Sequence, residues 1–264
     1  MGPFLAPAGQ ECPAYQTNQT RMIIASGITK TFGRLRVLDD FGVTMGGGHA
    51  FSLIGPNGSG KTTFIKCLLG TVIPDSGSVT LDGADLLRTP ALRSRIGYMP
   101  QIGRYPDNMR VGQLFDMLAE LRPSSNKRDE DLVQAFEMHR IADKPMRTLS
   151  GGTRQRVSAC IAFLFDPDVV VLDEPTAGLD PVSVEVLKEK VNAERRRGKL
   201  VLLTSHILSD LEDMTTDVIF LIEGRLRFCR AITELREESG GERLGRLMAR
   251  LMREAQHATT TPPS

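Results

Sequence analysis

Two glycine-rich segments of the chain contain the residue types that hold phosphate groups. The first, at residues 55–63, reads GPNGSGKTT and matches the pattern G-x-x-x-x-G-K-[ST]. In this pattern the glycines let the backbone curl around phosphate oxygens, and a helix N-terminus directs its N–H groups at them. The second, at residues 149–152, reads LSGG and places a serine hydroxyl and glycine amides at a predicted helix start. One active site does not need two such segments on the same face, whereas a dimer that sandwiches ATP does.

The residues that flank the first segment have the order that a phosphate loop requires. Residues 50–54 are almost wholly apolar, which predicts a buried parallel strand. Residues 62–70 have helical apolar spacing and end in Gly70, so the predicted order is strand, loop and helix. In that setting Lys61 would reach the β- and γ-phosphates of a nucleotide, and the Thr62 hydroxyl would be a ligand of Mg²⁺. The alternative is a glycine-rich turn with a chance lysine.

A second predicted strand ends in two neighbouring carboxylates. Residues 168–175 read DVVVLDEP, in which a β-branched run is followed by Asp173 and Glu174 and then by Pro175, which stops the strand. Ligands of open α/β sheets bind beyond the carboxyl ends of the strands, so both acids should lie beside the phosphate loop. Asp173 would hold Mg²⁺, and Glu174 would accept a proton from the attacking water. The alternative is that the two acids only solvate a strand end.

A third predicted strand, at residues 200–205, precedes a histidine. Of the four histidines in the chain, His206 alone follows a predicted buried strand. A neutral imidazole at this position could hydrogen-bond the γ-phosphate or the attacking water. Without the neighbouring motifs, a structural role for His206 would be the simpler interpretation.

Over residues 22–230 the chain resembles the nucleotide-binding subunits of ATP-binding-cassette (ABC) transporters, with all the motifs in family order. Residues 55–63 correspond to the Walker A motif of that family and residues 169–173 to Walker B, after which the family places its catalytic base. Residues 149–153 are similar to the signature motif, which completes the ATP site of the opposite subunit. Residues 177–180 resemble the D-loop.

Three single residues extend the resemblance. Gln101 matches the glutamine of the family's Q-loop, which touches Mg²⁺ or water and links to the membrane subunit. His206 resembles the switch histidine of the family. Phe32 stands where the family places an aromatic ring that stacks on adenine. The resemblance implies catalytic roles for Lys61, Glu174 and His206, and metal ligation by Thr62, Gln101 and Asp173. It also implies that the nucleotide is bound by residues of both glycine-rich segments and by single residues around them: Phe32, Gly55, Pro56, Asn57, Gly58, Ser59, Gly60, Lys61, Thr62, Thr63, Gln101, Ser150, Gly151, Gly152, Thr153 and Asp180.

The chain departs from the family pattern at three positions, none of which removes a catalytic group. Thr153 replaces the commonest signature glutamine, Phe32 stands where tyrosine is usual, and His49 occupies a position that is often glutamate. Because stacking needs an aromatic face rather than a hydroxyl, Phe32 should still serve. We expect these changes to alter affinity and not activity.

Composition excludes several classes of protein. The 33 basic and 32 acidic residues give no electrostatic footprint for nucleic acid, and no stretch reaches the ~18 uninterrupted apolar residues of a membrane span. The first twenty residues contain no lysine or arginine and no long apolar core, so we do not expect a secretory signal. Pro3, Pro7 and Pro13 stand among polar and small residues there, so we expect either a disordered N-terminal extension or residues upstream of the natural start. The four cysteines are widely spaced without a C-x-x-C pair, which is typical of reduced thiols in the cytoplasm.

The predicted fold class is α/β, a P-loop NTPase core with a mostly parallel sheet, an antiparallel β subdomain and an inserted helical subdomain at about residues 102–160. The predicted domain order is a disordered extension at 1–21, the ATPase domain at 22–230 and a C-terminal helix and disordered tail at 231–264. Residues 242–254 have the spacing of an amphipathic helix, which would pack on its own domain or contact a partner.

The leading functional hypothesis is an ATPase that uses ATP and Mg²⁺, forms a homodimer on ATP and drives a separate transmembrane permease. It would lie in the cytoplasm, bound to the inner face of the cell membrane through that permease. The alternative is a non-transport ABC ATPase that acts on a soluble macromolecular complex. Within the family, the segments around Gln101, Asp180 and His206 look like bacterial ABC-2-type export ATPases, most of all the ATPase subunits of nitrous-oxide reductase maturation and copper-site assembly.

Overall fold

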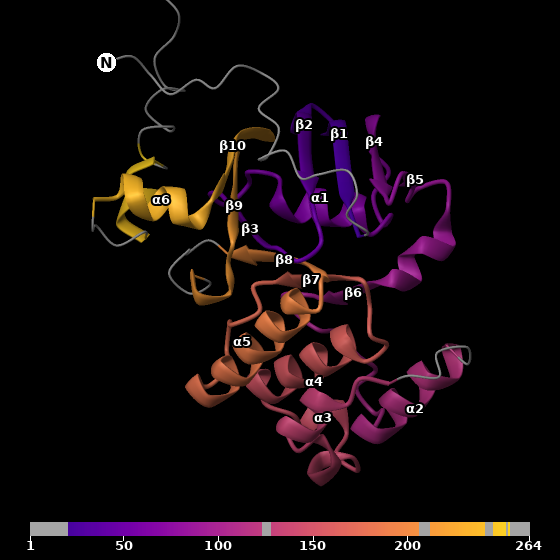
Figure 1. Cartoon of the computed structure of the whole chain (residues 1–264). Helices are drawn as coiled ribbons and strands as arrows, with labels where there is room; N and C mark the ends of the chain where they lie inside the picture. The colour runs from indigo at the N-terminus through magenta and orange to yellow at the C-terminus, as the bar shows by residue number, and fades with distance from the viewer. Residues whose placement is uncertain (1–20, 123–127, 206–211, 241–244, 252, 254–264) are drawn as a thin grey trace, which may run out of the picture.

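A six-stranded sheet divides the molecule into two halves (Figure 1). The structure is a computed structural model that describes residues 21–122, 128–205, 212–240, 245–251 and 253. The sheet has the strand order β10-β9-β3-β8-β7-β6, and all neighbouring pairs are parallel except β9 and β10. Its strands are β3 (Ala50–Ile54), β6 (Ile96–Met99), β7 (Val169–Asp173), β8 (Leu200–Ser205), β9 (Asp217–Ile222) and β10 (Arg225–Ala231).

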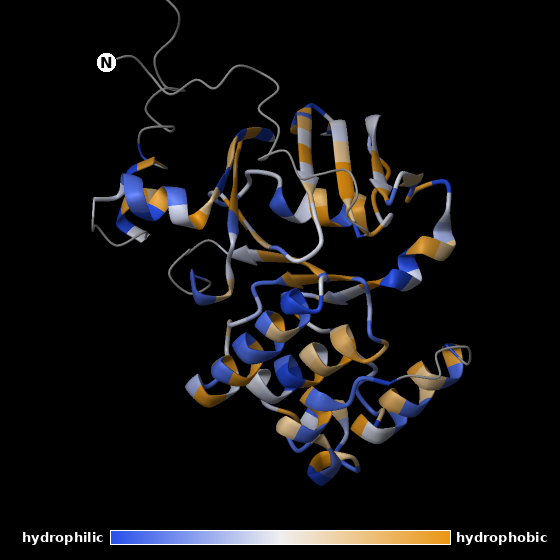
Figure 2. Ribbon diagram, viewed as in Figure 1, coloured by the Kyte–Doolittle hydropathy of each residue, from blue (hydrophilic) through white to orange (hydrophobic). Residues whose placement is uncertain are grey.

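The three strands predicted from the sequence are all in the middle of this sheet. Every residue of β3, β7 and β8 is buried, as expected for parallel strands that are covered on both faces. Alternate side chains enter different cores: Val169 and Val171 face the half that contains α1, whereas Val170 and Leu172 face the helical half. Figure 2 shows these apolar strands between layers of mixed polarity.

A second, antiparallel sheet covers one half of the molecule, with the order β2-β1-β4-β5. Its strands are β1 (Ile23–Phe32), β2 (Leu35–Met45), β4 (Ser76–Leu81) and β5 (Ala84–Asp85). A turn at Asp82 and Gly83 joins β4 to β5, and the two residues have positive φ angles of 51° and 81°. This backbone matches the tight hairpin turns that favour an Asp-Gly pair.

The helices occupy both sides of the central sheet. They are α1 (Lys61–Leu68), α2 (Val111–Leu121), α3 (Asp131–Ala135), α4 (Gly151–Phe163), α5 (Pro181–Arg196) and α6 (Ile232–Glu238), with short 3₁₀ turns at Pro90–Arg95, Met138–Ile141, Met146–Thr148 and Glu212–Met214. Helix α1 packs on the side of the antiparallel sheet, and α2 to α5 pack on the opposite side (Figure 1). The predicted fold class is therefore confirmed, while the predicted domain boundaries stay predictions.

The C-terminal segment contains one helix that the sequence analysis missed. Helix α6 has only seven residues, too few for a clear apolar periodicity, and it follows β10 directly. In the predicted second helix, Leu247 and Met248 are buried against Phe220 and Leu235, so this helix packs on its own chain. Leu244 and Met252, which were part of the same pattern, lie outside the described residues. Within the described ranges, no helix is long and apolar enough to cross a membrane.

The cysteines follow the prediction only in part. Cys67 and Cys160 are buried free thiols, and burial raises the pKa of the Cys67 thiol to about 11. Cys229 on β10 is disulfide-bonded, so the expectation of four reduced thiols is wrong at this position.

A buried ion network joins the inserted helices to the core. The ammonium of Lys190 on α5 pairs with Asp129, with Asp131 at 2.7 Å and with Glu194 at 3.0 Å, and Glu194 also pairs with Lys199 at 2.5 Å. Asp131 begins α3, so the network fixes α3 against α5. Because Lys190 and Glu194 are almost fully buried, each depends on its partners to offset the loss of water.

We expect Lys190→Met to lower the free energy of unfolding by about 3–5 kcal/mol, because it leaves buried carboxylates without their counter-charge. The matched control is Lys188→Met on the same helix, whose partners Glu185 and Asp213 are exposed, and whose loss should cost less than about 1 kcal/mol. Urea denaturation of both variants measures the difference. Equal destabilisation would contradict a structural role for the buried network.

Candidate functional site

The phosphate loop is held by close backbone approaches that only glycine allows. A Cβ on Gly55 would lie 2.1 Å from the carbonyl oxygen of Leu221 on β9, and one on Gly60 would lie 2.7 Å from that of Val37 on β2. Gly60 also has a φ of 107°, which favours glycine, and it is the N-cap of α1. The loop is thus fixed between both sheets, with the N-terminus of α1 pointing into it.

The side chain of Lys61 folds back over this loop. Its ammonium donates hydrogen bonds to the carbonyl oxygens of Gly55 at 2.7 Å and of Pro56 at 3.1 Å. Burial lowers the pKa of Lys61, and the negative charges of Glu174 and Asp173 act in the opposite direction. The lysine and the two acids, which are more than 110 positions apart in the chain, therefore share one electrostatic environment.

The acid pair lies at the carboxyl end of β7, as predicted, and is bonded to the neighbouring strand. Asp173 pairs in register with Thr204 on β8, and the Thr204 hydroxyl donates a 2.5 Å hydrogen bond to Asp173 Oδ1. The same hydroxyl accepts the backbone N–H of Glu174 at 3.1 Å. Burial raises the pKa of Asp173, and the Thr204 hydrogen bond opposes that shift. The sequence analysis gave Thr204 no role, although a hydroxyl near the end of an otherwise apolar strand is a detectable signal.

The second phosphate-facing segment begins α4, as predicted. Ser150 is the N-cap of α4, and its hydroxyl accepts the backbone N–H of Thr153 at 3.2 Å. A Cβ on Gly152 would lie 2.5 Å from the carbonyl oxygen of Gly178. Packing within the chain therefore accounts for the glycine at position 152. A Cβ on Gly151 would meet none of the described residues within 4 Å, so packing within the chain does not require glycine there.

Three other predicted site residues, Gln101, Phe32 and Asp180, lie at the ends of strands or helices. Gln101 is exposed and follows the carboxyl end of β6, next to β7 in the sheet. Phe32 ends β1 with 49% of its surface exposed, and the Lys30 ammonium lies 5.4 Å from its ring centroid. Asp180 caps α5 by accepting the backbone N–H of Ser183 at 3.0 Å, so a nucleotide contact by Asp180 stays a prediction.

Thr62 is exposed in the first turn of α1, next to Lys61. His206 lies outside the described residues, directly after β8, and its predicted role stays a prediction. His49, which departs from the family pattern, has its Nδ1 atom 2.8 Å from Asp217 Oδ2 at the amino ends of β3 and β9.

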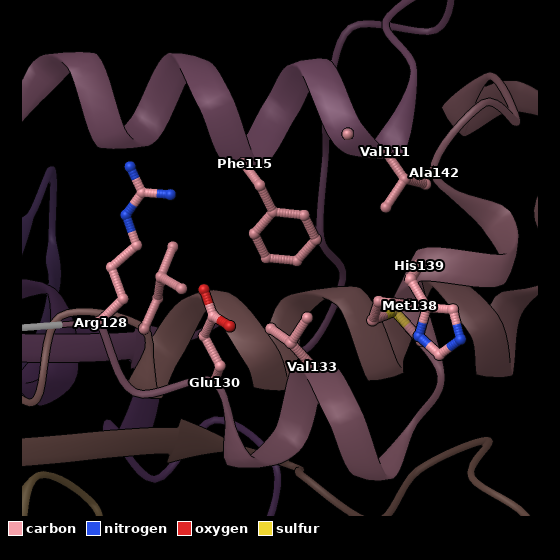
Figure 3. Close-up of a pocket in the computed structure, with 10 residues that line it drawn as sticks. Val111, Phe115, Arg128, Glu130, Val133, Met138, His139 and Ala142 are labelled. Carbon is pink, nitrogen blue, oxygen red and sulfur yellow. The ribbon is translucent and has the colours of Figure 1, made fainter.

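A separate cavity of about 130 Å³ lies between the inserted helices, away from the phosphate loop. Figure 3 shows Phe115 of α2 pointing towards Val133 of α3, with Arg128 and Glu130 at one end and His139 at the other. Its lining is mostly apolar and contains neither the lysine nor the acid pair. This cavity is suited to an apolar group rather than to phosphate.

A model of the ABC transporter family matches residues 38–177, which include the phosphate loop, the segment at 149–152 and the acid pair. The chain belongs to the ABC transporter family. The match covers more than half of its residues, and the motifs quoted from the sequence lie in the order of that family.

Relatives and solved structures agree with this assignment. The Nod factor export ATP-binding protein I of Ralstonia nicotianae is 32% identical over 221 residues, which are 82% of this chain and 69% of that protein. A solved ATP-binding subunit of an ABC transporter superposes with a TM-score of 0.79 at 26% identity, covering 87% of this chain and 99% of the other. A bacterial ABC transporter cassette solved as a dimer has the same fold, with a TM-score of 0.70 at 21% identity over 80% of this chain and 98% of the other. This ABC transporter chain is an ATP-binding subunit, and the cassettes of this family are ATPases coupled to transport.

In this ABC transporter subunit we expect Lys61→Ala to weaken ATP binding about 10–100-fold, the equivalent of roughly 1.5–3 kcal/mol for a hydrogen bond to a charged group. The change removes a positive charge that Gly55 and Pro56 hold over the loop. Titration with a fluorescent ATP analogue measures it. Lys66→Ala, exposed on the same helix, is the control and should bind normally. Unchanged affinity in Lys61→Ala would remove Lys61 from the phosphate site.

Proposed function

We propose that this chain is the ATP-hydrolysing subunit of an ABC exporter, working as a homodimer beneath a separate transmembrane permease. The observation that carries the proposal is the convergence of Lys61, Asp173 and Glu174 beside a glycine loop at the carboxyl edge of a parallel sheet. A family relative named for Nod factor export supports the direction of transport.

The residues of the loop fit a nucleotide with its magnesium ion. The Ser59 hydroxyl is buried without a hydrogen-bond partner among the described residues, which suits a group that receives a phosphate oxygen. Thr62, Gln101 and Asp173 offer the oxygen ligands that Mg²⁺ prefers. When bound, Mg²⁺ would neutralise phosphate charge. Phe32, exposed at the end of β1, would stack on the adenine ring.

The chain's own groups would divide the work of hydrolysis. Lys61 would exchange its two loop carbonyls for the β- and γ-phosphate oxygens and hold them in place. Glu174 would accept a proton from the water that attacks the γ-phosphate. His206 would hydrogen-bond the γ-phosphate or this water. The backbone amides of residues 55–63 would orient the phosphates before the reaction, which lowers its entropic cost.

The second phosphate-facing segment supports a sandwich dimer. Helices α1 and α4 lie on opposite sides of the central sheet, so one chain presents two phosphate-binding helix starts in different places (Figure 1). Ser150 and Gly151 are exposed, and a Cβ on Gly151 would have none of the described residues within 4 Å. We therefore infer that the segment of one subunit, with Gly152 and Thr153, closes on the γ-phosphate held by the other subunit.

The cavity between α2 and α3 supports contact with a permease. It is open, mostly apolar and rimmed by Arg128, Glu130 and His139, which suits an apolar side chain at the end of a polar helix. Gln101, between β6 and α2, would connect this surface to the nucleotide. Such docking would place the subunit at the inner face of the cell membrane. The resemblance to nitrous-oxide reductase maturation ATPases stays a prediction about cargo, which identification of the permease would test.

We expect Glu174→Gln to bind MgATP but to lose turnover about 10²–10⁴-fold, because an amide cannot accept the water's proton. The variant should accumulate as an ATP-bound dimer, visible by size-exclusion chromatography with light scattering. Steady-state phosphate release measures the loss of turnover. Wild-type turnover, with contaminating ATPase excluded, would show that another group is the base.

We expect Ser150→Arg, added to Glu174→Gln, to leave a folded monomer that binds ATP and does not dimerise. A bulky cation would occupy the surface that closes on the partner's γ-phosphate. Light scattering with MgATP compares the double variant with Glu174→Gln alone, and Arg110→Ser, an exposed position before α2, controls for surface changes. If the double variant dimerises as readily, the sandwich mechanism is wrong for this chain.

A further inference from the structure

Thr204 is the one described residue whose side chain bonds both acids of the site at once. Its hydroxyl donates to Asp173 Oδ1 at 2.5 Å and accepts the backbone N–H of Glu174 at 3.1 Å. Its carbonyl oxygen accepts the same N–H at 3.2 Å. Strand β8 thus holds the carboxylate of one acid and the backbone of the next.

The hydroxyl is not needed for packing. Thr204 is fully buried, and the residues before it in β8 are all leucine or valine. Valine has nearly the shape of threonine and forms strands equally well, whereas a buried hydroxyl loses its hydration and needs hydrogen-bond partners. A threonine here is therefore explained by the two bonds that its hydroxyl makes at the acid pair.

The bond to Glu174 falls at a point where the backbone turns sharply. Glu174 has a φ of 52°, in the left-handed region that residues other than glycine seldom occupy. Such a conformation persists only when its surroundings fix it, and it sets the direction in which the Glu174 side chain leaves the strand. The Thr204 hydroxyl and carbonyl hold the N–H of this residue, and Pro175 follows it directly.

We propose that Thr204 is a positioning residue for ATP hydrolysis, whose hydroxyl fixes Asp173 and Glu174 so that Glu174 faces the attacking water. This rests on the proposed role of Glu174 as the base. Thr204 does not touch the phosphates in this scheme and acts only through the two acids. Because displacement of a reacting group by about 1 Å can cost 10²-fold in rate, loss of the hydroxyl should slow hydrolysis much more than it weakens ATP binding.

The test compares Thr204→Val, which removes only the hydroxyl, with Thr204→Ser, which keeps it. In the full chain, Thr204→Val should lower kcat about 10–100-fold with little change in KM for ATP, while Thr204→Ser should stay close to wild type. With MgATP, Thr204→Val should accumulate as a dimer by light scattering. Thr215→Val is the control: among the described residues its hydroxyl bonds Ser52 at 2.5 Å and neither acid, and the change should leave both readouts unchanged.

A double-mutant cycle with Glu174→Gln tests whether Thr204 acts through the proposed base. In a double-mutant cycle, Thr204→Val should add no loss to Glu174→Gln, because both act on one step. Wild-type kcat in Thr204→Val, equal losses in the valine and serine variants, or an additive loss in the cycle would each overturn the proposal. If Thr204→Val fails to fold, Thr204→Ala replaces it in the same comparisons. Full activity in Glu174→Gln would instead refute the proposed base, so the two failures are distinguishable.

Discussion

Parallel pairing of β6, β7, β8 and β3 is the constraint on which the site depends. Parallel strands place all their carboxyl ends at one edge, so the groups that follow them meet there whatever their separation in sequence. The phosphate loop follows β3, the acid pair closes β7, and Gln101 follows β6. The strand register, in which Asp173 of β7 pairs with Thr204 of β8, then places the Thr204 hydroxyl beside the Asp173 carboxylate. A shift by one residue would turn the Thr204 side chain to the other face of the sheet.

Close contacts between backbones keep this edge in place. On β6, a Cβ at Gly97 would lie 1.9 Å from the carbonyl oxygen of Ala162, so the end of α4 packs directly on the sheet. Gly55 and Gly60 likewise bring the phosphate loop close to β9 and β2. The Lys190 network also joins α3 to α5, and apolar residues of both helices, Leu132, Leu187 and Val191, lie in one buried cluster.

Burial and nearby negative charges act in opposite directions on Lys61 in the loop. The Lys61 ammonium satisfies its hydrogen bonds on loop carbonyls and is attracted by Asp173 and Glu174, whose charges oppose the effect of burial. A phosphate group would offer Lys61 a charged acceptor in place of neutral ones, and charged acceptors form the stronger hydrogen bonds. At the second glycine-rich segment, the Ser150 hydroxyl accepts the backbone N–H of Thr153 and so caps its own helix.

The sequence by itself determined the strand, loop and helix order, the acids at a strand end, and Ser150 at a helix start, because each is encoded by local spacing and by residue types with few alternative uses. It also determined the fold class through the order of these segments. Only the tertiary structure decided that Thr204 bonds the acid pair and that Lys190 is buried among carboxylates from other elements. These contacts join residues through strand register and helix packing, and α6 is too short to show a periodicity. Such relations arise only when distant segments meet, so no local pattern carries them.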